Sequence, residues 1–411
     1  MTFDKLGLNK EILEAVKSKG YKTATAIQSG SIPVILEGRD VLGGAQTGTG
    51  KTAAFALPIL NNLNNDTGKY KNPRALVLTP TRELAAQVGE SFTHYGKNLT
   101  LRSTTVFGGV KINPQIATFK NGTDILVATP GRLLDHINQG TVKLNQIQVL
   151  VLDEADRMLD MGFIRDIKKI ISKLPKERQN LLFSATYGKE IRGLAEDLLK
   201  NPVSIEVTKR NSAAENVKQL VYNVEKGQKR ALLQHLIEQE SWYQVLVFVR
   251  TKHGANRLAK ALGKEGVPSA AIHGDKSQGA RTRALNDFKK GDLQALIATD
   301  VAARGIHLDN LSHVVNFELP QVAEDYVHRI GRTGRAGKSG TAISLVSHEE
   351  NSQLKKIEKM LKRNIENAVA KGFKPPKTDK SKNQKVPDPF KYNPKAGNKK
   401  NGGNFNRKYK K

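Results

Sequence analysis

Short, continuous apolar runs recur along the chain, and they limit its fold more than any other feature. Eight of them cover residues 75–78, 125–128, 149–152, 181–183, 245–249, 269–272, 295–298 and 314–317. Uninterrupted runs of this length are typical of strands that are buried on both faces of a parallel sheet. Longer amphipathic stretches, such as 82–95 and 253–262, separate the runs. The sequence therefore predicts an α/β fold of βαβ units with helices on both faces of the sheet.

This pattern occurs twice, on either side of a polar stretch at residues 208–214. The length of 411 residues also suggests two or three domains. From both observations we predict a first domain that ends at residue 205, a linker at 206–216, a second domain at 217–370 and a tail at 371–411.

The last 41 residues differ in composition from the rest. They hold 14 basic residues against two acidic ones, a net charge of +12, and only seven apolar residues. Such a segment cannot bury enough apolar surface to offset the entropy of ordering it, so we expect a basic, low-complexity, disordered tail. The whole chain carries a formal charge of +28. This charge favours a polyanionic partner, with solubility alone as the alternative explanation.

Missing residue types and patterns exclude several classes of protein. The chain has no cysteine, so it has no disulfide, thiolate metal site or thiol nucleophile, and it has no His-Glu-x-x-His zinc protease motif. Its apolar runs are far shorter than the roughly 18 residues of a membrane-spanning helix. The first five residues show no apolar core of a signal peptide. We therefore expect a cytoplasmic protein without a membrane partner.

Residues 45–52 read Ala-Gln-Thr-Gly-Thr-Gly-Lys-Thr and stand between the apolar run 41–43 and a helical pattern. The glycines allow backbone N–H groups to close around phosphates at the positive end of a helix. We expect Lys51 to reach the β- and γ-phosphates of a nucleotide and the Thr52 hydroxyl to bind Mg²⁺. A dinucleotide fingerprint, Gly48-x-Gly50-x-x-Ala53, also fits loosely, but it leaves Lys51 and Thr52 without a role.

Two further clusters fit a nucleoside triphosphatase. Asp153 and Glu154 follow the apolar run 149–152, where Asp153 would hold Mg²⁺ through water and Glu154 would orient and deprotonate the attacking water. Residues 328–335 carry arginines at 329, 332 and 335. This spacing puts them on one helical face if the segment is helical. A guanidinium suits the charge that spreads over a γ-phosphate in the transition state, whereas the plainer alternative is a basic surface helix.

Taken in order, these motifs resemble the DEAD-box ATP-dependent RNA helicase family over about residues 3–350. The matching residues are Phe3 with Gly20-Tyr21 and Ile27-Gln28, residues 45–52, Pro80 to Ala85, Gly108-Gly109, Thr129 to Arg132, Asp153 to Asp156, Ser184 to Thr186, Phe248 to Thr251, His273-Gly274 with Gln278 and Arg281, Ala298 to Gly305, and His328 to Arg335. Residues 277–285 resemble the bacterial RhlE-type subgroup in particular.

The resemblance implies two tandem RecA-like domains, with ATP and RNA bound across the cleft between them. Residues 1–29 become the Q-motif region, 30–205 the ATP-binding domain and 217–370 the helicase C-terminal domain. The catalytic residues implied are Lys51, Asp153, Glu154, Arg332 and Arg335. The implied ATP contacts are Phe3 on the base, Gln28 on the adenine edge, and Ala45, Gln46, Thr47, Gly48, Thr49, Gly50, Lys51 and Thr52. Thr52 and Asp153 would hold Mg²⁺.

The resemblance also implies an RNA path that reads phosphates and 2′-hydroxyl groups, so binding would be independent of base sequence. Its implied residues are Thr81, Arg82, Gly108, Gly109, Thr129, Gly131 and Arg132 in the first domain, and Gln278, Arg281, Thr299 and Asp300 in the second. Ser184, Thr186 and His328 would couple ATP binding to RNA binding. Two positions depart from the family pattern. Ala24 replaces a proline, which we expect to loosen a turn, and His307 replaces an aspartate that usually addresses the ribose.

Three functions remain open from the sequence. The first is an RNA-stimulated ATPase that unwinds short duplexes, and the second is an ATP-dependent RNA clamp on which other proteins assemble. The third, a DNA helicase, is disfavoured by the motifs. Ribosome assembly and RNA decay are both open as settings, and the sequence identifies no protein partner.

Overall fold

The computed structural model describes residues 1–45, 48–66, 68, 70–207, 217–303, 306, 308, 311–334 and 340–373. We call residues 1–207 lobe 1 and residues 217–373 lobe 2. Several predictions lie outside the described residues. They concern Gln46, Thr47, Arg335, His307, the linker from residue 208 onward and the tail from residue 374 onward. Within the described part of the chain, no helix is long and apolar enough to cross a membrane.

Each lobe is built on one seven-stranded sheet in which every pair of neighbouring strands is parallel. The strands of lobe 1 are β1 (Val41–Gly44), β2 (Ala75–Leu78), β3 (Ser103–Val106), β4 (Ile125–Ala128), β5 (Val149–Leu152), β6 (Gln179–Ser184) and β7 (Val203–Glu206). Those of lobe 2 are β8 (Val217–Asn223), β9 (Val245–Phe248), β10 (Ser269–Ile272), β11 (Ala295–Ala298), β12 (His313–Asn316), β13 (Gly340–Val346) and β14 (Glu366–Ala368).

The helices connect these strands in the way that βαβ units require. In lobe 1 they are the 3₁₀ helix η1 (Phe3–Leu6) and α1 (Lys10–Ser18), α2 (Ala26–Leu36), α3 (Lys51–Asn65), α4 (Arg82–Tyr95), α5 (Ile112–Lys120), α6 (Pro130–Asn138), α7 (Ala155–Asp160), α8 (Ile164–Ile171) and α9 (Lys189–Leu198). In lobe 2 they are η2 (Lys226–Gln228), α11 (Lys229–Gln239), α12 (Lys252–Lys264), α13 (Gln278–Lys290), α14 (Asp300–Ala303), α15 (Ala323–Ile330), η3 (His348–Glu350) and α16 (Asn351–Leu361).

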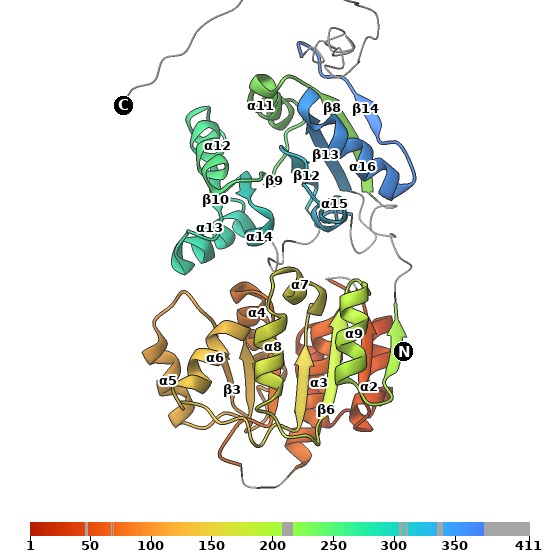
Figure 1. Ribbon diagram of the computed structural model, residues 1–411, viewed down its shortest axis with the longest axis vertical. Helices are drawn as coiled ribbons and strands as arrows, with labels where there is room; N and C mark the ends of the chain where they lie inside the picture. Colours follow the sequence, from red (N-terminus) through yellow and green to blue (C-terminus); the bar gives the residue numbers. More distant parts are fainter. Residues whose placement is uncertain are drawn as a thin grey trace, which may run out of the picture. The chain divides into compact units, whose positions relative to one another are not determined.

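Each sheet is buried on both faces, as the continuous apolar runs predict. In β2, Ala75 and Val77 belong to one core cluster while Leu76 and Leu78 belong to another. Helices lie on both sides of this sheet (Figure 1). Because successive side chains point to opposite faces, a strand between two apolar layers needs an apolar residue at every position.

The two sheets have the same strand order. Lobe 1 runs β3-β4-β2-β5-β6-β1-β7, and lobe 2 runs β10-β11-β9-β12-β13-β8-β14. The strand pattern that appears twice in the sequence therefore corresponds to two tandem sheets of one topology. β8 of lobe 2 takes the place of β1, and β9 takes the place of β2.

The strands that the apolar runs do not reveal are mostly at sheet edges. β3, β7 and β14 are all outermost strands. The residues of β3 alternate between buried and partly buried, and those of β7 and β14 are all at least partly exposed. An edge strand needs apolar residues on only part of its surface, so a continuous run is not required there, although β10, which is also outermost, has one. β7 also ends at Glu206, one residue inside the predicted linker.

Lobe 2 continues past the predicted boundary at residue 370. Phe373 packs against the core cluster of lobe 2, and its ring centroid lies 5.3 Å from that of His235 on α11. At least three residues of the predicted tail therefore belong to the folded lobe.

Candidate functional site

The phosphate-binding loop lies at the carboxyl end of β1, between the sheet and α3. The N–H of Ala45 donates to the carbonyl of Ser184 at the end of β6, at 3.2 Å. Gly48 and Gly50 have φ angles of +85° and +91°, which L side chains adopt only with strain. The loop therefore needs its glycines, and it delivers Lys51 as the first residue of α3.

Lys51 is the clearest sign that this loop takes an anion. Its side chain is buried, and its Nζ atom has no hydrogen-bond partner among the described residues. A buried ammonium without a partner is costly unless a ligand of opposite charge satisfies it. The helix N-terminus beside it also favours negative charge. The arrangement fits the phosphates of a nucleotide.

Gln28 connects α2 to the phosphate-binding loop. Its Oε1 accepts from the N–H of Thr25 at 2.9 Å, and its Nε2 donates to the carbonyl of Gly50 at 3.1 Å. A Cβ atom at Gly50 would lie 2.4 Å from this Nε2. The residue expected to read adenine therefore sits directly against the loop expected to hold the phosphates. Phe3, expected to pack on the base, lies in the core cluster of lobe 1 with 5% exposure.

Asp153 and Glu154 follow β5, at the same edge of the sheet. Both side chains are buried, and the N–H of Asp153 donates to the carbonyl of Leu78 at 3.0 Å. Glu154 has φ +53° and ψ +51°, a left-handed conformation that is unfavourable for a residue with a Cβ atom. Its Oε2 lies 3.2 Å from Nε of Arg157, a buried ion pair that holds the carboxylate in place.

Asp156 links this acidic segment to Ser184 and Thr186. Its Oδ2 accepts hydrogen bonds from the N–H of Ala185, the N–H of Thr186 and the hydroxyl of Thr186, at 3.2, 3.0 and 3.1 Å. The hydroxyl of Ser184 donates to the carbonyl of Thr186 at 2.6 Å. Of the predicted coupling residues of lobe 1, Thr186 is thus bonded directly to the segment that carries Glu154, and Ser184 is bonded to Thr186.

The oxygen donors in this site fit Mg²⁺. Thr52 is the second residue of α3 and supplies a hydroxyl, and Asp153 supplies a buried carboxylate. No cluster of three or more metal-ligating side chains occurs within the described ranges. Mg²⁺ commonly binds through one or two protein oxygens together with water and substrate phosphates, and the oxygens of Thr52 and Asp153 are of this kind.

Arg329 and Arg332 do not share one helical face. α15 ends at Ile330, and Gly331 is its C-cap, so Arg332 lies beyond the helix. Gly334, with φ +65°, turns the chain away from a helical path. Arg332 is buried and donates from Nη1 to the carbonyl of Ile306 at 3.0 Å. The third arginine of the series, Arg335, is outside the described residues.

Arg329 has a structural role that the motif does not reveal. It is 1% exposed and binds both oxygens of Asp300, at 2.6 and 2.7 Å. It also donates to the side chain of Asn316 at 3.0 Å and to the carbonyl of Glu318 at 2.6 Å. Asp300, a predicted RNA contact, therefore has both carboxylate oxygens engaged within lobe 2. Thr299, the residue before it, is 7% exposed.

His328 lies on α15 in a strongly perturbed environment. Burial, reinforced by the positive charge of Arg157, lowers the pKa of its imidazole from 6.5 to about 4. Arg157 lines a small cavity together with His328, Arg329, Arg332 and other residues of lobe 2. The guanidinium that holds Glu154 thus also faces the predicted coupling residue.

The predicted RNA residues of lobe 1 surround the turn at Gly108 and Gly109. Gly109 has φ +77°, and a Cβ atom there would lie 1.8 Å from Nη1 of Arg82. Arg132, on α6, donates from Nη2 to the carbonyl of Val110 at 3.0 Å. Two predicted RNA contacts, Arg82 and Arg132, therefore lie on either side of this turn.

The threonines and Gly131 lie at the starts of helices. Thr81 is the N-cap of α4, and its Oγ1 accepts from the N–H of Leu84 at 3.3 Å. Thr129 is the N-cap of α6, and its N–H donates to the carbonyl of Val106 at 3.1 Å. Gly131 is the second residue of α6, and a Cβ atom there would have no described neighbour within 4 Å. Helix N-termini are suited to phosphate contacts.

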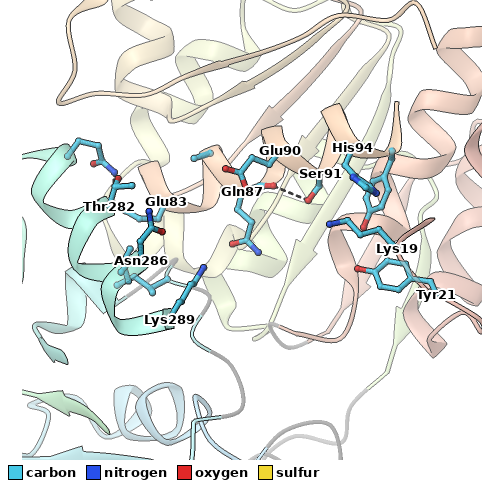
Figure 2. A pocket seen from close by; sticks show the side chains of 15 residues that line it. Lys19, Tyr21, Glu83, Gln87, Glu90, Ser91, His94, Thr282, Asn286 and Lys289 are labelled. Atoms are coloured by element: carbon cyan, nitrogen blue, oxygen red, sulfur yellow. Dashed lines mark hydrogen bonds between the residues drawn. The ribbon is translucent and has the colours of Figure 1, made fainter. Parts of the chain in front are cut away.

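Gln278 and Arg281, the predicted RNA contacts on α13, meet Glu83 of α4. Glu83 accepts from Nε2 of Gln278 at 3.1 Å and pairs with Nη2 of Arg281 at 2.9 Å, and both charged side chains are 8% exposed. A polar cavity of about 410 Å³ lies beside this contact. Figure 2 shows Glu83, Gln87, Glu90 and Ser91 following one another along α4, with Thr282, Asn286 and Lys289 facing them from α13.

Ala24, the first departure from the family pattern, makes a contact that proline could not make. Its N–H donates to the carbonyl of Met1 at 2.9 Å. This bond ties the N-terminal segment to the residues just before α2.

Sequence reasoning missed two residues of the site, Gln115 and Arg157, and also the contacts that Glu83 and Arg329 make within their motifs. Gln115, whose Oε1 accepts from Nη1 of Arg132 at 3.0 Å, and Arg157 each resemble an ordinary polar residue in sequence. Only Arg157 carried a local signal, because it is three residues after Glu154 on the same helix face.

Comparison with known proteins agrees with this geometry. The DEAD/DEAH box helicase family model matches residues 25–194, and the helicase conserved C-terminal domain model matches residues 228–337. The chain is 46% identical over 365 residues to the DEAD-box ATP-dependent RNA helicase CshA of Bacillus cereus, covering 89% of this chain and 69% of that one. It is 45% identical over 365 residues to the ATP-dependent RNA helicase DeaD of Buchnera aphidicola, and this match covers 89% of this chain and 60% of that one.

Solved structures with the same fold include nucleotide and RNA complexes. Dbp5 of S. cerevisiae, bound to RNA and ADP BeF3, has a TM-score of 0.79 and 34% identity, with 90% of this chain and 95% of that chain covered. The DEAD-box helicase Mss116, bound to ssRNA and UDP-BeF, has a TM-score of 0.81 and 28% identity, with 90% and 80% covered.

Proposed function

The chain belongs to the DEAD-box family of ATP-dependent RNA helicases, and we propose that it separates short RNA duplexes locally, without long-range translocation. One observation carries this proposal. Asp156 bonds the segment of Glu154 to the segment of Ser184 and Thr186. These hydrogen bonds can therefore transmit a structural change at the ATP phosphates to the residues proposed to sense RNA.

The proposed chemistry is hydrolysis of the γ-phosphate of ATP. Lys51 binds the β- and γ-phosphates, and Glu154, oriented by Arg157, accepts a proton from the attacking water. Arg332 and Arg335 stabilise the charge that develops on the γ-phosphate. Phe3, Gln28 and residues 45–52 hold the nucleotide. These roles are supported by the orphaned ammonium of Lys51 and by the buried ion pair of Glu154.

Mg²⁺ is part of the proposal. Thr52 and Asp153 would hold the ion, which supplies charge neutralisation at the phosphates when bound.

Cooperative binding of ATP and RNA is the proposed source of unwinding. The RNA residues named above contact the backbone of one strand in a shape that a duplex cannot keep. Stacking contributes a mean of about 1.4 kcal/mol per step in DNA, so opening a few pairs brings a short duplex near dissociation. Backbone contacts carry little base information, so we propose that recognition is independent of sequence.

Multiple-turnover ATPase and duplex-unwinding assays on one preparation test the proposal. We expect RNA to stimulate ATP hydrolysis and unwinding to require ATP. ATP-stimulated binding of RNA, without duplex unwinding and without repeated hydrolysis of ATP, would favour the alternative function, an ATP-dependent RNA clamp. Stimulation by DNA as strong as by RNA would contradict RNA specificity.

Finer assignments also remain proposals. The RhlE-type subgroup rests on residues 277–285 alone, and the relatives named above are CshA and DeaD. We also propose the domain boundaries given above, with the second domain extended to Phe373, and a cytoplasmic location. Crosslinking in the native cells, followed by sequencing of the bound RNA, would distinguish ribosome assembly from RNA decay.

A further inference from the structure

We propose that Gln115 is a positioning residue for the RNA surface of lobe 1, because it holds the Gly108–Gly109 turn at both ends. The inference rests on the proposed function, in which this turn and its two flanking arginines contact RNA. Gln115 lies on α5, outside every motif of the sequence, and is 8% exposed.

The amide of Gln115 reaches the residues on either side of the turn. Its Nε2 donates to the carbonyl of Phe107, the residue before Gly108, at 3.0 Å. Its Oε1 accepts from Nη1 of Arg132 at 3.0 Å. Arg132 in turn donates to the carbonyl of Val110, the residue after Gly109, at 3.0 Å. One side chain thus fixes both carbonyls that bracket the two glycines, the first directly and the second through Arg132.

The chemistry of these partners allows only one orientation of the amide. A backbone carbonyl can only accept, and a guanidinium can only donate. The amide nitrogen must therefore face Phe107 and the oxygen must face Arg132. His136, which is fully buried, adds a further contact from its Nε2 to the same oxygen, at 3.1 Å. Since that oxygen accepts, Nε2 of His136 carries the proton.

The position of the turn matters because Arg82 packs directly against it. The side chain of Arg82 occupies the space that a Cβ atom on Gly109 would need. A shift of the turn therefore displaces Arg82. Loss of the Gln115 contact leaves Arg132 held only by its hydrogen bond to Val110, which lies in the turn itself, and by its ion pair with Asp135 at 3.4 Å. Both arginines belong to the proposed RNA surface, so one substitution at Gln115 disturbs two phosphate contacts together.

Two variants separate the parts of this network. Gln115→Met keeps the approximate volume and removes every hydrogen bond of the amide. Gln115→Glu keeps an acceptor for Arg132 and His136 but loses the donor to Phe107. We expect the Kd for single-stranded RNA, measured with a non-hydrolysable ATP analogue, to rise about tenfold or more in Gln115→Met. The rise should be smaller in Gln115→Glu.

Gln179→Met is the matched control. Gln179 is also a glutamine of lobe 1 with 8% exposure, and its Nε2 donates to the carbonyls of Ile35 and Arg39, far in sequence from the turn. We expect Gln179→Met to lower the Tm as Gln115→Met does, but to leave the Kd for RNA unchanged. The affinity for the ATP analogue without RNA, measured in parallel, should be similar in all variants.

The outcomes distinguish this inference from the function on which it rests. Wild-type RNA affinity in Gln115→Met, or an equal loss of affinity in Gln179→Met, would overturn the inference alone. If Gln115→Met does not fold, wild-type affinity in Gln115→Glu would overturn it as well. Absence of nucleotide-dependent RNA binding by the wild type would overturn the proposed function and the inference together.

Discussion

At the scale of single residues, the backbone of Glu154 has a conformation that lowers local stability. The left-handed backbone of this residue, with φ +53°, costs an L-residue about 1–2 kcal/mol. Its carboxylate is also buried, which is tolerable because Arg157 pairs with it. The turn between β5 and α7 thereby fixes the direction of the carboxylate, which agrees with the role proposed for Glu154 of addressing one water molecule.

Glu154→Gln should stop turnover while ATP and RNA still bind. The amide keeps the size of the side chain but cannot accept the proton of the attacking water. The ternary complex should therefore accumulate, which gel-shift assays with ATP and labelled RNA would detect. ATP hydrolysis near the wild-type rate would remove Glu154 from the role of general base.

Gly109→Ala should weaken RNA binding more than it weakens the fold. The new Cβ atom would lie 1.8 Å from Nη1 of Arg82, so this guanidinium must move. Gly140→Ala is the control, because Gly140 also has a positive φ, +67°, but among the described residues other than its chain neighbours no atom lies within 4 Å of its Cβ position. Both variants should lose stability to a similar degree, since both introduce strain at positive φ. Only Gly109→Ala should raise the RNA Kd, as fluorescence anisotropy would measure, and an equal rise in both would contradict this interpretation.

At the scale of elements, two corresponding helices of the lobes differ in the partner of their first residue. α3 and α11 follow the corresponding strands β1 and β8, and each begins with a buried lysine, Lys51 or Lys229. The Nζ of Lys229 donates to the carboxylate of Glu350 and to the carbonyl of Phe317. The N–H groups of Leu319 and Ser347 also donate to Glu350, each at 3.1 Å. In lobe 2 a carboxylate of the chain itself satisfies the lysine at this place.

Glu350→Gln should destabilise the protein by about 3–5 kcal/mol, because it leaves the buried ammonium of Lys229 without a counter-charge. The neighbouring residue provides the control. Glu349 pairs with Lys226, and both of these side chains are about two-thirds exposed, at 66% and 67%. Solvent screens such a pair, so Glu349→Gln should leave the urea midpoint almost unchanged. Equal midpoints for the two variants would show that the Glu350 pair is not a stabilising contact.

The same ion pair should make stability depend on pH. Burial alone would raise the pKa of Glu350, but the ammonium of Lys229 and the surrounding donors outweigh it and hold the pKa below the ordinary 4.5. The stabilisation is therefore fully present above pH 4.5 and is lost as the pH falls through the lower pKa of the folded state. Urea unfolding at a series of acidic pH values should show a smaller decline in Glu350→Gln than in the wild type. An equal loss of stability with falling pH in the wild type and in Glu350→Gln would exclude the Glu350 carboxylate as a cause of the pH dependence.

At the scale of the whole molecule, most of the positive charge of the predicted tail lies beyond the last described residue of lobe 2, Phe373. Residues 374–411 carry 13 basic and two acidic residues, a net charge of +11. Residues 371–373 precede this segment, and Phe373 packs on His235. Two truncations can therefore divide the predicted tail into a part that contributes to lobe 2 and a part that contributes charge.

Truncation after Phe373 should weaken RNA binding without lowering the Tm. On single strands, each neutralised phosphate contributes about −0.7 to the slope of log K against log salt. If the removed segment engages three phosphates, the slope should flatten by about two. An unchanged salt dependence would mean that this segment does not bind RNA.

Truncation after Ala370 should lower the Tm as well, because it also removes the ring of Phe373 from the core of lobe 2. Thermal unfolding of the two truncated proteins, side by side, measures the difference. Equal Tm values would show that the contact between Phe373 and His235 contributes nothing to stability.

Much of the fold could be predicted from the sequence because its causes are local. The continuous apolar runs predicted β2, β4, β5 and β11 with the observed bounds, since a strand between two apolar layers needs an apolar residue at every position. The bounds of the edge strand β10 were predicted as well. α4 was likewise predicted over its full length. The phosphate-binding loop could be found because its glycines, its lysine and its helix start are consecutive in the chain.

The tertiary structure alone decided which polar residues meet. Arg132 and Gln115 are 17 residues apart, Lys229 and Glu350 are 121 apart, and Gln278 and Glu83 are 195 apart. No spacing rule pairs such residues, because each pairing depends on the order of strands in a sheet and on the packing of helices against it. The sequence by itself determined two parallel sheets and a nucleotide loop. The folded chain determined which charges are satisfied internally and which, like the ammonium of Lys51, are left for a ligand.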